Sequence, residues 1–261
     1  MRIQPKKNLG QHFLRDKNII GKIVAAIAPQ ASDHIVEIGP GLGALTQALL
    51  PHIDHLAVVE FDRDLIAPLK ELCEGLGALT IYHQDVLQFD FEALKPASQS
   101  LRIVGNLPYQ ISTPLLFYLI QYVTWIKDLH FMLQKEVVDR LAAKPGSKAY
   151  GRLSVMIQYH FKVQALFSVS RMAFHPPPQV ESAVVRLIPQ SRTLPANDYA
   201  HFSELVKQAF NHRRKTLANS LKGEVATEQF AQAGIDLKAR PETLSVDDFV
   251  RLSNCSVHTK I

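Results

Sequence analysis

The sequence has little cysteine and no long apolar run. Its 261 residues include two cysteines, Cys73 and Cys255, which lie far apart and match no metal-ligand spacing. This argues against a disulfide framework and fits a reducing compartment. No apolar run reaches the length of about 18 residues that a membrane span needs. The basic N-terminus also lacks the apolar core of a secretory signal. We therefore expect a cytoplasmic protein without a metal site.

Acidic residues are missing from two stretches. Residues 140–180 contain six Lys or Arg and no acid, and residues 211–222 contain four and no acid. Residues 1–22 hold six bases against one acid, whereas residues 33–92 hold eleven acids and two bases, a local net charge of −9. This segregation suggests one region for a small, cationic ligand and others that face a polyanion. For a single run, a solvated face is an equally good interpretation.

The composition, 47% hydrophobic and 20% charged, excludes a disordered chain. Over the first two-thirds, short apolar runs alternate with amphipathic stretches, which predicts βαβ units and a parallel sheet covered on both faces. Two later runs are candidate strands for an antiparallel pair at the sheet edge. The runs of the parallel sheet are His34–Ile38, Leu56–Glu60, Leu79–His83, Leu101–Val104 and Leu129–Leu133, and the later two are Val155–Phe161 and Ala183–Ile188.

Beyond Pro189 the pattern becomes helical. Apolar residues recur at helical spacing within Asp198–Lys222, and two shorter helices are expected at Thr227–Ala233 and Val246–Leu252. The predicted fold class is therefore α/β. A Rossmann-like sheet with helices on both faces occupies residues 1–191, and a small all-helical domain occupies residues 192–261.

A glycine-rich loop follows the first predicted strand. The segment Glu37–Gly43 places glycines at Gly39, Gly41 and Gly43 and opens a helical stretch, Ala44–Leu50. Glycine lets the backbone turn sharply and lets a ligand lie against it. The spacing G-x-G-x-G differs from the dinucleotide fingerprint G-x-G-x-x-G.

Acidic residues follow the next two strands. Glu60 ends the second strand, where a carboxylate can bind ribose hydroxyls. Asp85 follows the third strand and can accept a hydrogen bond from an adenine amino group, with Val86 as apolar cover. Both acids and the glycine loop lie at the carboxyl ends of successive strands, where open α/β sheets bind ligands.

These three features resemble the first three motifs of class I S-adenosylmethionine-dependent methyltransferases. In that family the loop packs the methionine portion, the second motif holds the ribose and the third reads the adenine. No lysine near the loop could grip a phosphate, and the local net charge of −9 suits a sulfonium cation. The resemblance implies S-adenosyl-L-methionine as cofactor, S-adenosyl-L-homocysteine as product, and a class I methyltransferase sheet.

A fourth motif, Asn106-Leu107-Pro108-Tyr109, follows the fourth strand. Taken alone it is a turn. In this position it resembles the [DNS]-P-P-Y motif of amino-methyltransferases, in the N-L-P-Y form that is typical of rRNA adenine N6-dimethyltransferases. Asn106 is also a candidate contact of the cofactor.

The residue types of this motif suit methylation of an adenine amine, whose lone pair is delocalised into the ring. The Asn106 oxygen and the Leu107 carbonyl could accept its two hydrogens, and Pro108 would hold that carbonyl in place. Tyr109 could stack on the flipped base, a contact worth about 1–3 kcal/mol. Positioning then supplies most of the catalysis, so no general base is nominated. The histidines, His12 and His175 among them, are interpreted as binding or surface residues.

Four further stretches narrow the family: Gly10–Leu14 (GQHFL), Phe131–Val137, Tyr150–Ser154 (YGRLS) and Phe174–Ser182 (FHPPPQVES). Together the motifs resemble the bacterial small-subunit rRNA adenine N6,N6-dimethyltransferases, the KsgA/RsmA family, over nearly the whole chain. The resemblance implies that His12 and Leu14 contact the cofactor and that Phe174 is a second stacking face for the base. His12 and Gln110 stand where the family often has Asn, which leaves open whether His12 acts through its side chain or its backbone.

The resemblance implies that two adjacent adenosines near the 3′ end of 16S rRNA are each dimethylated on N6. The protein would act as a monomer on the small ribosomal subunit, with a role in ribosome biogenesis. Two alternatives stay open: a large-subunit rRNA adenine methyltransferase that confers antibiotic resistance, and a mainly non-enzymatic assembly factor. The expected rRNA-binding residues are Arg213, Arg214 and Lys215 on the 198–222 helix, with Lys222, Arg140, Lys144, Lys148 and Arg152.

Overall fold

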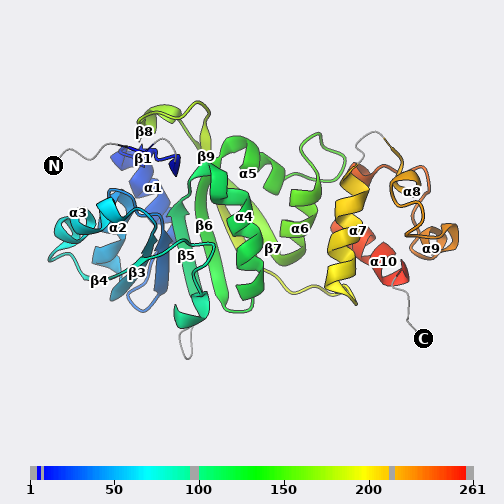
Figure 1. Ribbon diagram of the computed structural model, residues 1–261, viewed down its shortest axis with the longest axis horizontal. Coiled ribbons are helices and arrows are strands. Elements are labelled where there is room, and N and C mark those ends of the chain that lie inside the picture. The colour runs from blue at the N-terminus through cyan, green and yellow to red at the C-terminus, as the bar shows by residue number, and fades with distance from the viewer. Residues whose placement is uncertain (1–4, 7–8, 95–99, 212–214, 257–261) are drawn as a thin grey trace. The chain divides into compact units, whose positions relative to one another are not determined.

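The computed structural model in Figure 1 describes residues 5–6, 9–94, 100–211 and 215–256. The chain forms two compact units, one of residues 1–138 and 163–189 and the other of residues 139–162 and 190–261. The second unit thus takes in more of the chain than the helical segment 192–261 that the sequence sets apart, and that domain boundary stays a prediction.

A seven-stranded sheet organises the first unit, in the order β4-β3-β2-β5-β6-β9-β7. The five strands from β4 to β6 run parallel, and β9 pairs antiparallel with β6. The predicted parallel strands are confirmed, and so is an antiparallel strand towards the edge. The bounds are β2 His34–Ile38, β3 His55–Glu60, β4 Ala78–His83, β5 Leu101–Asn106, β6 Ile126–Gln134, β7 Phe161–Val169 and β9 Ser182–Pro189.

The order of the strands creates a switch point between β2 and β5. The chain builds outward from β2 to β3 and β4, then returns to form β5 on the other side of β2. His34 of β2 is level with Leu101 of β5, and Glu37 with Val104. Connections that leave neighbouring strands in opposite directions open a crevice at their carboxyl ends, which is where α/β sheets bind ligands.

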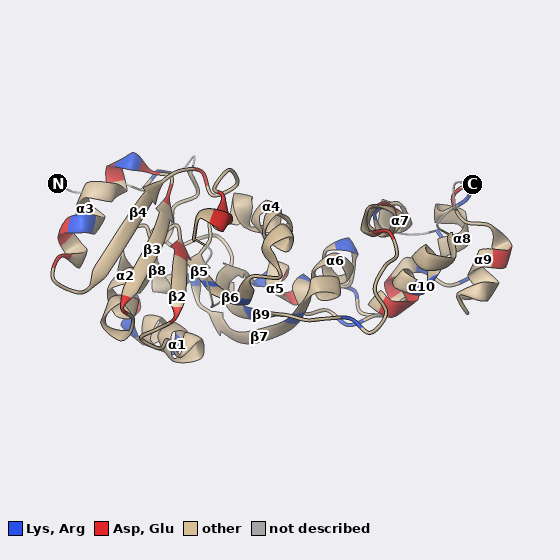
Figure 2. Cartoon of the chain, turned by 90° about the horizontal axis from the view of Figure 1, so that it is seen from below, with Lys and Arg blue, Asp and Glu red and all other residues tan. Residues whose placement is uncertain are grey.

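Helices cover both faces of the sheet, as predicted. On one face lie α1 (Lys17–Ile27), α2 (Ala44–Leu49) and α3 (Arg63–Cys73), whose apolar side chains share one core cluster with β2, β3, β5 and β6. On the other side lies α4 (Tyr109–Leu119), which contacts β6, and Figure 2 shows it across the sheet from α1 and α2. Helix α5 (Lys135–Leu141) follows β6 directly.

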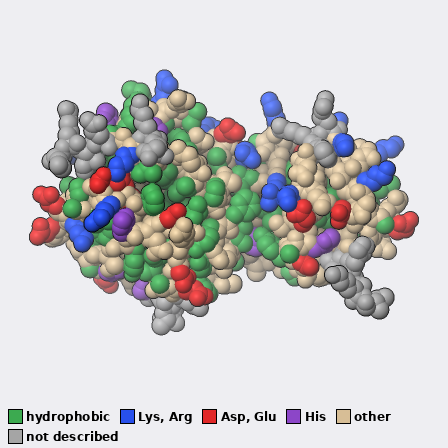
Figure 3. Space-filling view, in the orientation of Figure 1, with side chains coloured by type: hydrophobic (Ala, Val, Ile, Leu, Met, Phe, Trp, Pro, Cys, Tyr) green, Lys and Arg blue, Asp and Glu red, His purple; other side chains and the backbone are tan. Residues whose placement is uncertain are grey.

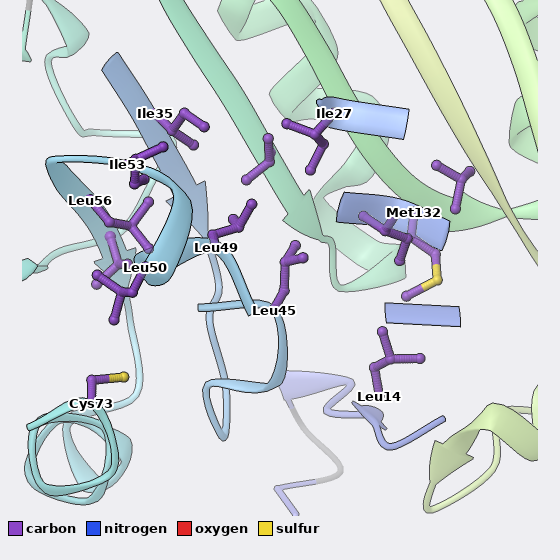
Figure 4. Packing of buried hydrophobic residues seen from close by; sticks show 14 of the residues in the cluster. Leu14, Ile27, Ile35, Leu45, Leu49, Leu50, Ile53, Leu56, Cys73 and Met132 are labelled. Carbon is purple, nitrogen blue, oxygen red and sulfur yellow. The ribbon is translucent and has the colours of Figure 1, made fainter. Parts of the chain in front are cut away.

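The core cluster shows why these segments fold as they do. Ile27 of α1, Leu45 and Leu49 of α2 and Ile35 of β2 are all buried, and Figure 4 shows them gathered between the helices and the sheet. Burying each such side chain contributes roughly 1.5–3 kcal/mol. Spacings of four along the helices and two along the strands bring all of them to one layer.

Charged groups are buried in the same layer. Arg102 on β5 is 3% exposed and bonds Asp128 on β6 through Nε and Nη2, at 2.9 and 3.0 Å. His130, two residues further along β6, is 2% exposed, and its Nδ1 lies 3.6 Å from the Asp128 carboxylate. Burial lowers the pKa of His130 to about 4, against the attraction of Asp128. His130 is therefore not a surface residue.

The second unit is helical, with one difference from the prediction. The segment expected as a strand at Val155–Phe161 is helix α6 (Arg152–His160), and β7 begins only at Phe161. Leu153, Val155, Met156 and Ile157 are all buried. A short apolar run whose residues are all buried shows no alternation of apolar and polar residues that could distinguish a strand from a helix. The sequence pattern therefore gave the wrong assignment here.

The long helix expected at Asp198–Lys222 is not continuous. Helix α7 is described as far as Asn211, Lys215 lies in a bend, Thr216 has extended backbone (ψ 158°), and a short separate helix α8 follows. The apolar residues that recur at helical spacing stop at Phe210, so the pattern itself does not extend to Lys222. The remaining helices of this unit are α7 Tyr199–Asn211, α8 Leu217–Ser220, α9 Thr227–Gln232 and α10 Val246–Ser256.

Short 3₁₀ turns complete the described structure, at Leu50–His52, Phe91–Leu94, Ile120–Tyr122, Arg171–Ala173 and Pro241–Thr243. In the described ranges, no helix combines the length and the apolar character needed to cross a membrane.

Candidate active site

A cavity of about 250 Å³ lies in the first unit, at the carboxyl ends of β2 to β6. It contains most of the site residues that the sequence predicts, although they come from five separate segments of the chain. The predicted residues among its lining are His12, Leu14, Gly39, Gly41, Glu60, Asp85, Val86, Asn106, Leu107, Pro108 and Tyr109. Gly43 and Phe174 are not part of the lining.

The glycine loop forms one wall of the cavity. Gly39 and Gly41 have φ angles of +64° and +58°, which glycine adopts without the strain that a Cβ would cause. A Cβ at Gly41 would also lie 3.1 Å from the ring of Phe13. Gly43 has another role, since a Cβ there would come within 2.7 Å of Leu69 on α3. The loop therefore needs glycine both to line the cavity and to pack its helix.

Glu60 braces this loop from the end of β3. Its carboxylate accepts hydrogen bonds from the backbone N–H groups of Asp62 at 2.7 Å and Gly41 at 3.2 Å. Burial raises the pKa of Glu60, although these two bonds oppose the rise. The Glu60 carboxylate, which is predicted to bind the ribose, is thus held in a defined orientation by the protein itself.

Glu37 at the end of β2 is a lining residue that the sequence analysis quoted within the loop motif but did not nominate. It is 2% exposed and accepts a hydrogen bond from the Thr46 hydroxyl at 2.6 Å. Burial raises the pKa of Glu37 to about 8, the Thr46 bond lowers it and the nearby Glu60 raises it further. An acid that ends an otherwise apolar strand run was the signal available in the sequence.

The far end of the cavity suits an adenine ring. Asp85 lies after β4 and accepts a hydrogen bond from the Leu87 N–H at 2.9 Å, and the next residue, Val86, is buried and also lines the cavity. Phe61, directly after Glu60, also lines the cavity and is 57% exposed. An aromatic face, an apolar floor and a carboxylate together match the groups that recognise a purine.

The lining fits a cationic nucleoside better than a nucleotide. Three carboxylic acids, Glu37, Glu60 and Asp85, face the cavity, and the described lining includes no Lys or Arg that could hold a phosphate. Figure 2 marks acidic residues in red on β2 and α3 of this unit. The residues present therefore fit S-adenosylmethionine, with its sulfonium and ammonium charges. The described residues contain no cluster of His, Cys, Asp or Glu arranged to bind a metal ion.

The Asn106–Tyr109 motif stands beside the cavity between β5 and α4. Asn106 ends β5, and the Leu107 N–H donates to the Met132 carbonyl of β6 at 3.2 Å. Pro108 is the residue before the first turn of α4, with φ −54°. The Tyr109 hydroxyl lies 2.8 Å from Ser182 Oγ, and burial raises the Tyr109 pKa, so the hydroxyl stays protonated. The motif is therefore held from three sides.

Two short strands bring the N-terminus to this motif. Strand β1 (Phe13–Leu14) pairs antiparallel with β8 (Phe174–His175), so Leu14 is level with Phe174. Phe174 is 5% exposed and belongs to the core cluster rather than to the cavity. The His12 ring stacks on Tyr109, with ring centres 5.9 Å apart. The assignment of Phe174 as a stacking face stays a prediction.

The predicted rRNA-binding residues lie in the second unit. Arg213 and Arg214 fall outside the described residues, and Lys215 lies in a bend rather than in the expected helix. The others are exposed, namely Arg140, Lys144, Lys148, Arg152 and Lys222. Figure 3 shows several Lys and Arg side chains on the visible face of this unit, with acidic ones among them. Their RNA contacts stay a prediction.

Comparison with known proteins identifies the family. The profile of "Ribosomal RNA adenine dimethylase" matches residues 2–257, nearly the entire chain. The chain belongs to the ribosomal RNA adenine dimethylase family. "Ribosomal RNA small subunit methyltransferase A" of Alcanivorax borkumensis is 53% identical over 252 residues, which are 96% of this chain and 90% of that protein.

Solved structures of this fold agree with the assignment. A dimethyladenosine transferase from Plasmodium falciparum superposes with a TM-score of 0.81 at 29% identity, covering 92% of this chain and 96% of that one. The 23S rRNA methyltransferase ErmE superposes with a TM-score of 0.73 at 23% identity, covering 94% and 99%, and shares the fold. The predicted Rossmann-like methyltransferase fold with a helical C-terminal region is confirmed, and the chain is an rRNA adenine dimethylase by family.

Proposed function

We propose that this dimethylase uses S-adenosylmethionine to dimethylate N6 of two adjacent adenosines in the 3′-terminal hairpin of 16S rRNA, as a step in ribosome biogenesis. The observation that carries the proposal is that one cavity is lined both by the acids Glu37, Glu60 and Asp85 and by the Asn106–Tyr109 motif. The small-subunit name of the 53% identical relative supports the choice of RNA. We also propose that the protein acts as a monomer in the cytoplasm, where its rRNA substrate is.

The chain's part in catalysis is binding and orientation. When bound, S-adenosylmethionine supplies a methyl group that its sulfonium already activates. Glu60 would hold the ribose and Asp85 the adenine, while Gly39 and Gly41 let the methionine portion lie against the backbone. These contacts keep the methyl group in line with the target amine, which is worth several orders of magnitude in rate.

Asn106 and Leu107 would prepare the target amine. Their oxygens accept its two N–H bonds, so the nitrogen lone pair is no longer shared with the ring and points at the methyl group. The Leu107 backbone is fixed by its hydrogen bond to the Met132 carbonyl, and Pro108 has a fixed φ and restricts the conformation of Leu107 before it. Tyr109 offers a face for the flipped base. The proton that the methylated amine releases passes to solvent, because its acidity makes a dedicated base unnecessary.

The experiment is methyl transfer to defined ribosomal particles. Purified protein is incubated with radiolabelled S-adenosylmethionine and small subunits from a strain that lacks this modification, and reverse-transcription stops then locate the product. We expect label in two neighbouring adenosines of the 3′-terminal hairpin. Label in large-subunit RNA instead would favour the antibiotic-resistance alternative, and no label in either subunit would favour an assembly factor.

Removing the Asn106 side chain separates chemistry from binding. Asn106→Ala should lower the single-turnover transfer rate by about a hundredfold or more, because one of the two acceptors for the amine is lost. The affinity for S-adenosylhomocysteine, measured by calorimetry, should change little. Transfer at the wild-type rate would show that Asn106 is not an acceptor for the amine.

A further inference from the structure

The Asn106 side chain makes one contact that the proposed chemistry does not use. Its Nδ2 lies 3.0 Å from the backbone carbonyl oxygen of His12. A carbonyl oxygen can only accept a hydrogen bond, so the atom that faces it has to be the amide nitrogen. This contact decides which way round the Asn106 amide stands.

The other end of the amide is left open towards the cavity. Asn106 lines the cavity, and within the described part of the chain its Oδ1 accepts no hydrogen bond. With the amide turned over, Oδ1 would face the His12 oxygen, and Nδ2 would face the hydrogens of the incoming amine. Both contacts would then join groups of like polarity, so the turned amide could not prepare the amine.

His12 belongs to a strap formed by residues 5–6 and 9–14 of the N-terminal segment. The His12 ring is anchored on both sides, because its Nδ1 donates to the Pro176 carbonyl at 2.8 Å and its plane stacks on Tyr109 at 30°. The pairing of β1 with β8 follows at once. At Gly10 a Cβ would collide with the Gln110 side chain, so the strap there lies close to the first turn of α4, directly after Tyr109. The His12 carbonyl is therefore held in a defined place.

A charged clasp fastens the other end of the strap. Lys6 Nζ bonds Asp62 and Asp64 at 2.6 Å each, and Gln11 Nε2 donates to Asp62 at 2.7 Å. Burial raises the pKa of Asp62, but the Lys6 and Gln11 bonds outweigh it and lower that pKa overall. Asp62 precedes α3, so the clasp joins the strap to the helix that follows the ribose-binding strand.

We propose that the strap positions the catalytic amide: with the strap closed, the His12 carbonyl turns Asn106 so that Oδ1 faces the target amine. Closing the strap over the cofactor and completing the acceptor for the base are then one event. His12 acts in this through its backbone and through Asn106, as a positioning residue. The proposal rests on the proposed function, since it assigns the device to that same site.

The first test is Asn106→Asp. A carboxylate has nearly the same shape and is the stronger acceptor for an amine, so it would serve well if acceptance alone mattered. It offers no donor to the His12 carbonyl, and the two oxygens repel. We expect the single-turnover transfer rate to fall about tenfold or more while S-adenosylhomocysteine still binds. A rate within about twofold of the wild type would overturn the proposal.

The second test loosens the strap with Lys6→Ala/Gln11→Ala, which removes the clasp and leaves the catalytic motif intact. If the strap acts through Asn106, Asn106→Asp should lower the single-turnover transfer rate much less in this background, because the His12 contact is already weakened. The control, Lys70→Ala/Gln121→Ala, removes an exposed Lys and an exposed Gln outside the strap and clasp, and should leave the full cost of Asn106→Asp. An equal cost in both backgrounds would overturn the proposal.

A readout independent of methyl transfer comes from the Asn106 side-chain amide. Its ¹⁵N–¹H signals are assigned by their loss in Asn106→Asp, and they should shift in the strap-loosened variant but not in the control. Unchanged signals in the strap-loosened variant would refute the His12 contact. If the wild-type chain methylates no ribosomal RNA, the proposed function has failed, and these signals still test the contact separately.

Discussion

Single residues near the cavity carry protonation states that burial sets, with opposite consequences for stability. Glu37 is held in its neutral form because its pKa is about 8. His130 is also neutral, because its pKa is lowered to about 4. Protonation of His130 would place a charge beside Arg102 and Arg186, which the attraction of Asp128 and a hydrogen bond with the Ala26 backbone oppose. Neither residue needs to ionise for the proposed transfer.

The raised pKa of Glu37 makes stability depend on pH. Folded Glu37 binds its proton more tightly than an unfolded glutamate, whose pKa is 4.5, so the stabilisation is complete below that value and is lost as pH rises through about 8. Glu37→Gln keeps a neutral side chain throughout. The free energy of unfolding of the variant relative to wild type should therefore rise by on the order of 2–4 kcal/mol between about pH 5 and pH 9.

Urea denaturation of both proteins across this pH range measures the difference. Thr46→Val provides a control, because it removes the hydroxyl that bonds Glu37 but leaves the carboxyl in place, and its pH dependence should persist. A pH-independent difference between Glu37→Gln and wild type would mean that Glu37 is ionised in the folded protein.

At the scale of the elements, a buried ion network ties strands and a helix together. Arg102 on β5 bonds Asp128 on β6, the Asp33 carboxylate before β2 at 2.7 Å, and the Ile27 carbonyl at the end of α1 at 2.6 Å. Arg186 on β9 reaches the same Asp128 at 2.9 Å. The sheet is thereby held by specific polar contacts as well as by apolar packing, and those contacts also align α1 with β5.

Arg102→Met should destabilise the protein strongly. Asp128 is fully buried and, among the described residues, would keep only Arg186 as a close cationic partner, so the loss is about 3–5 kcal/mol of unfolding free energy. Lys127→Met is the matched control, because it removes an exposed partner of Asp33 and should cost about 0–1 kcal/mol. Urea midpoints decide between them. Equal losses for the two variants would contradict the role of burial.

Across the whole molecule, the charge is divided between the two units. The second unit carries 15 Lys and Arg against 9 Asp and Glu, whereas the first carries 14 against 15. The net charge of +5 is thus made of a basic unit of +6 and a nearly neutral one of −1 that contains the acid-lined cavity. This division agrees with one unit for a cationic cofactor and another for a polyanion.

The division predicts a salt dependence for rRNA binding. Lys144→Ala and Lys222→Ala should each lower the slope of log affinity against log salt by about 0.7–0.9, if each neutralises one phosphate. Lys207 lies in the same unit but is paired with Glu204 at 2.9 Å, so Lys207→Ala should leave the slope unchanged. Filter binding to small-subunit RNA at several salt concentrations measures the slopes. Identical slopes for all variants would remove these two lysines from the interface.

The sequence by itself determined which segments form the parallel strands, where the glycine loop lies, and eleven of the residues that line the cavity. These are local matters, because a period of two or 3.6, a glycine spacing or an acid after a strand is written in neighbouring residues. Segments without such a period were misread. Leu153–Ile157 is an unbroken run of buried residues within helix α6, and the apolar residues at helical spacing after Asp198 stop at Phe210, short of Lys222.

Only the tertiary structure decided which distant groups meet. Nothing near Asn106 in the sequence indicates that the carbonyl of His12, 94 residues earlier, orients its amide, or that His130 lies buried beside Asp128. Such pairings depend on how the sheet folds the chain back on itself. A backbone carbonyl is also present at every residue, so it carries no sequence signal. The residue types of the site could be predicted from local sequence patterns, but the orientation of its side chains could not.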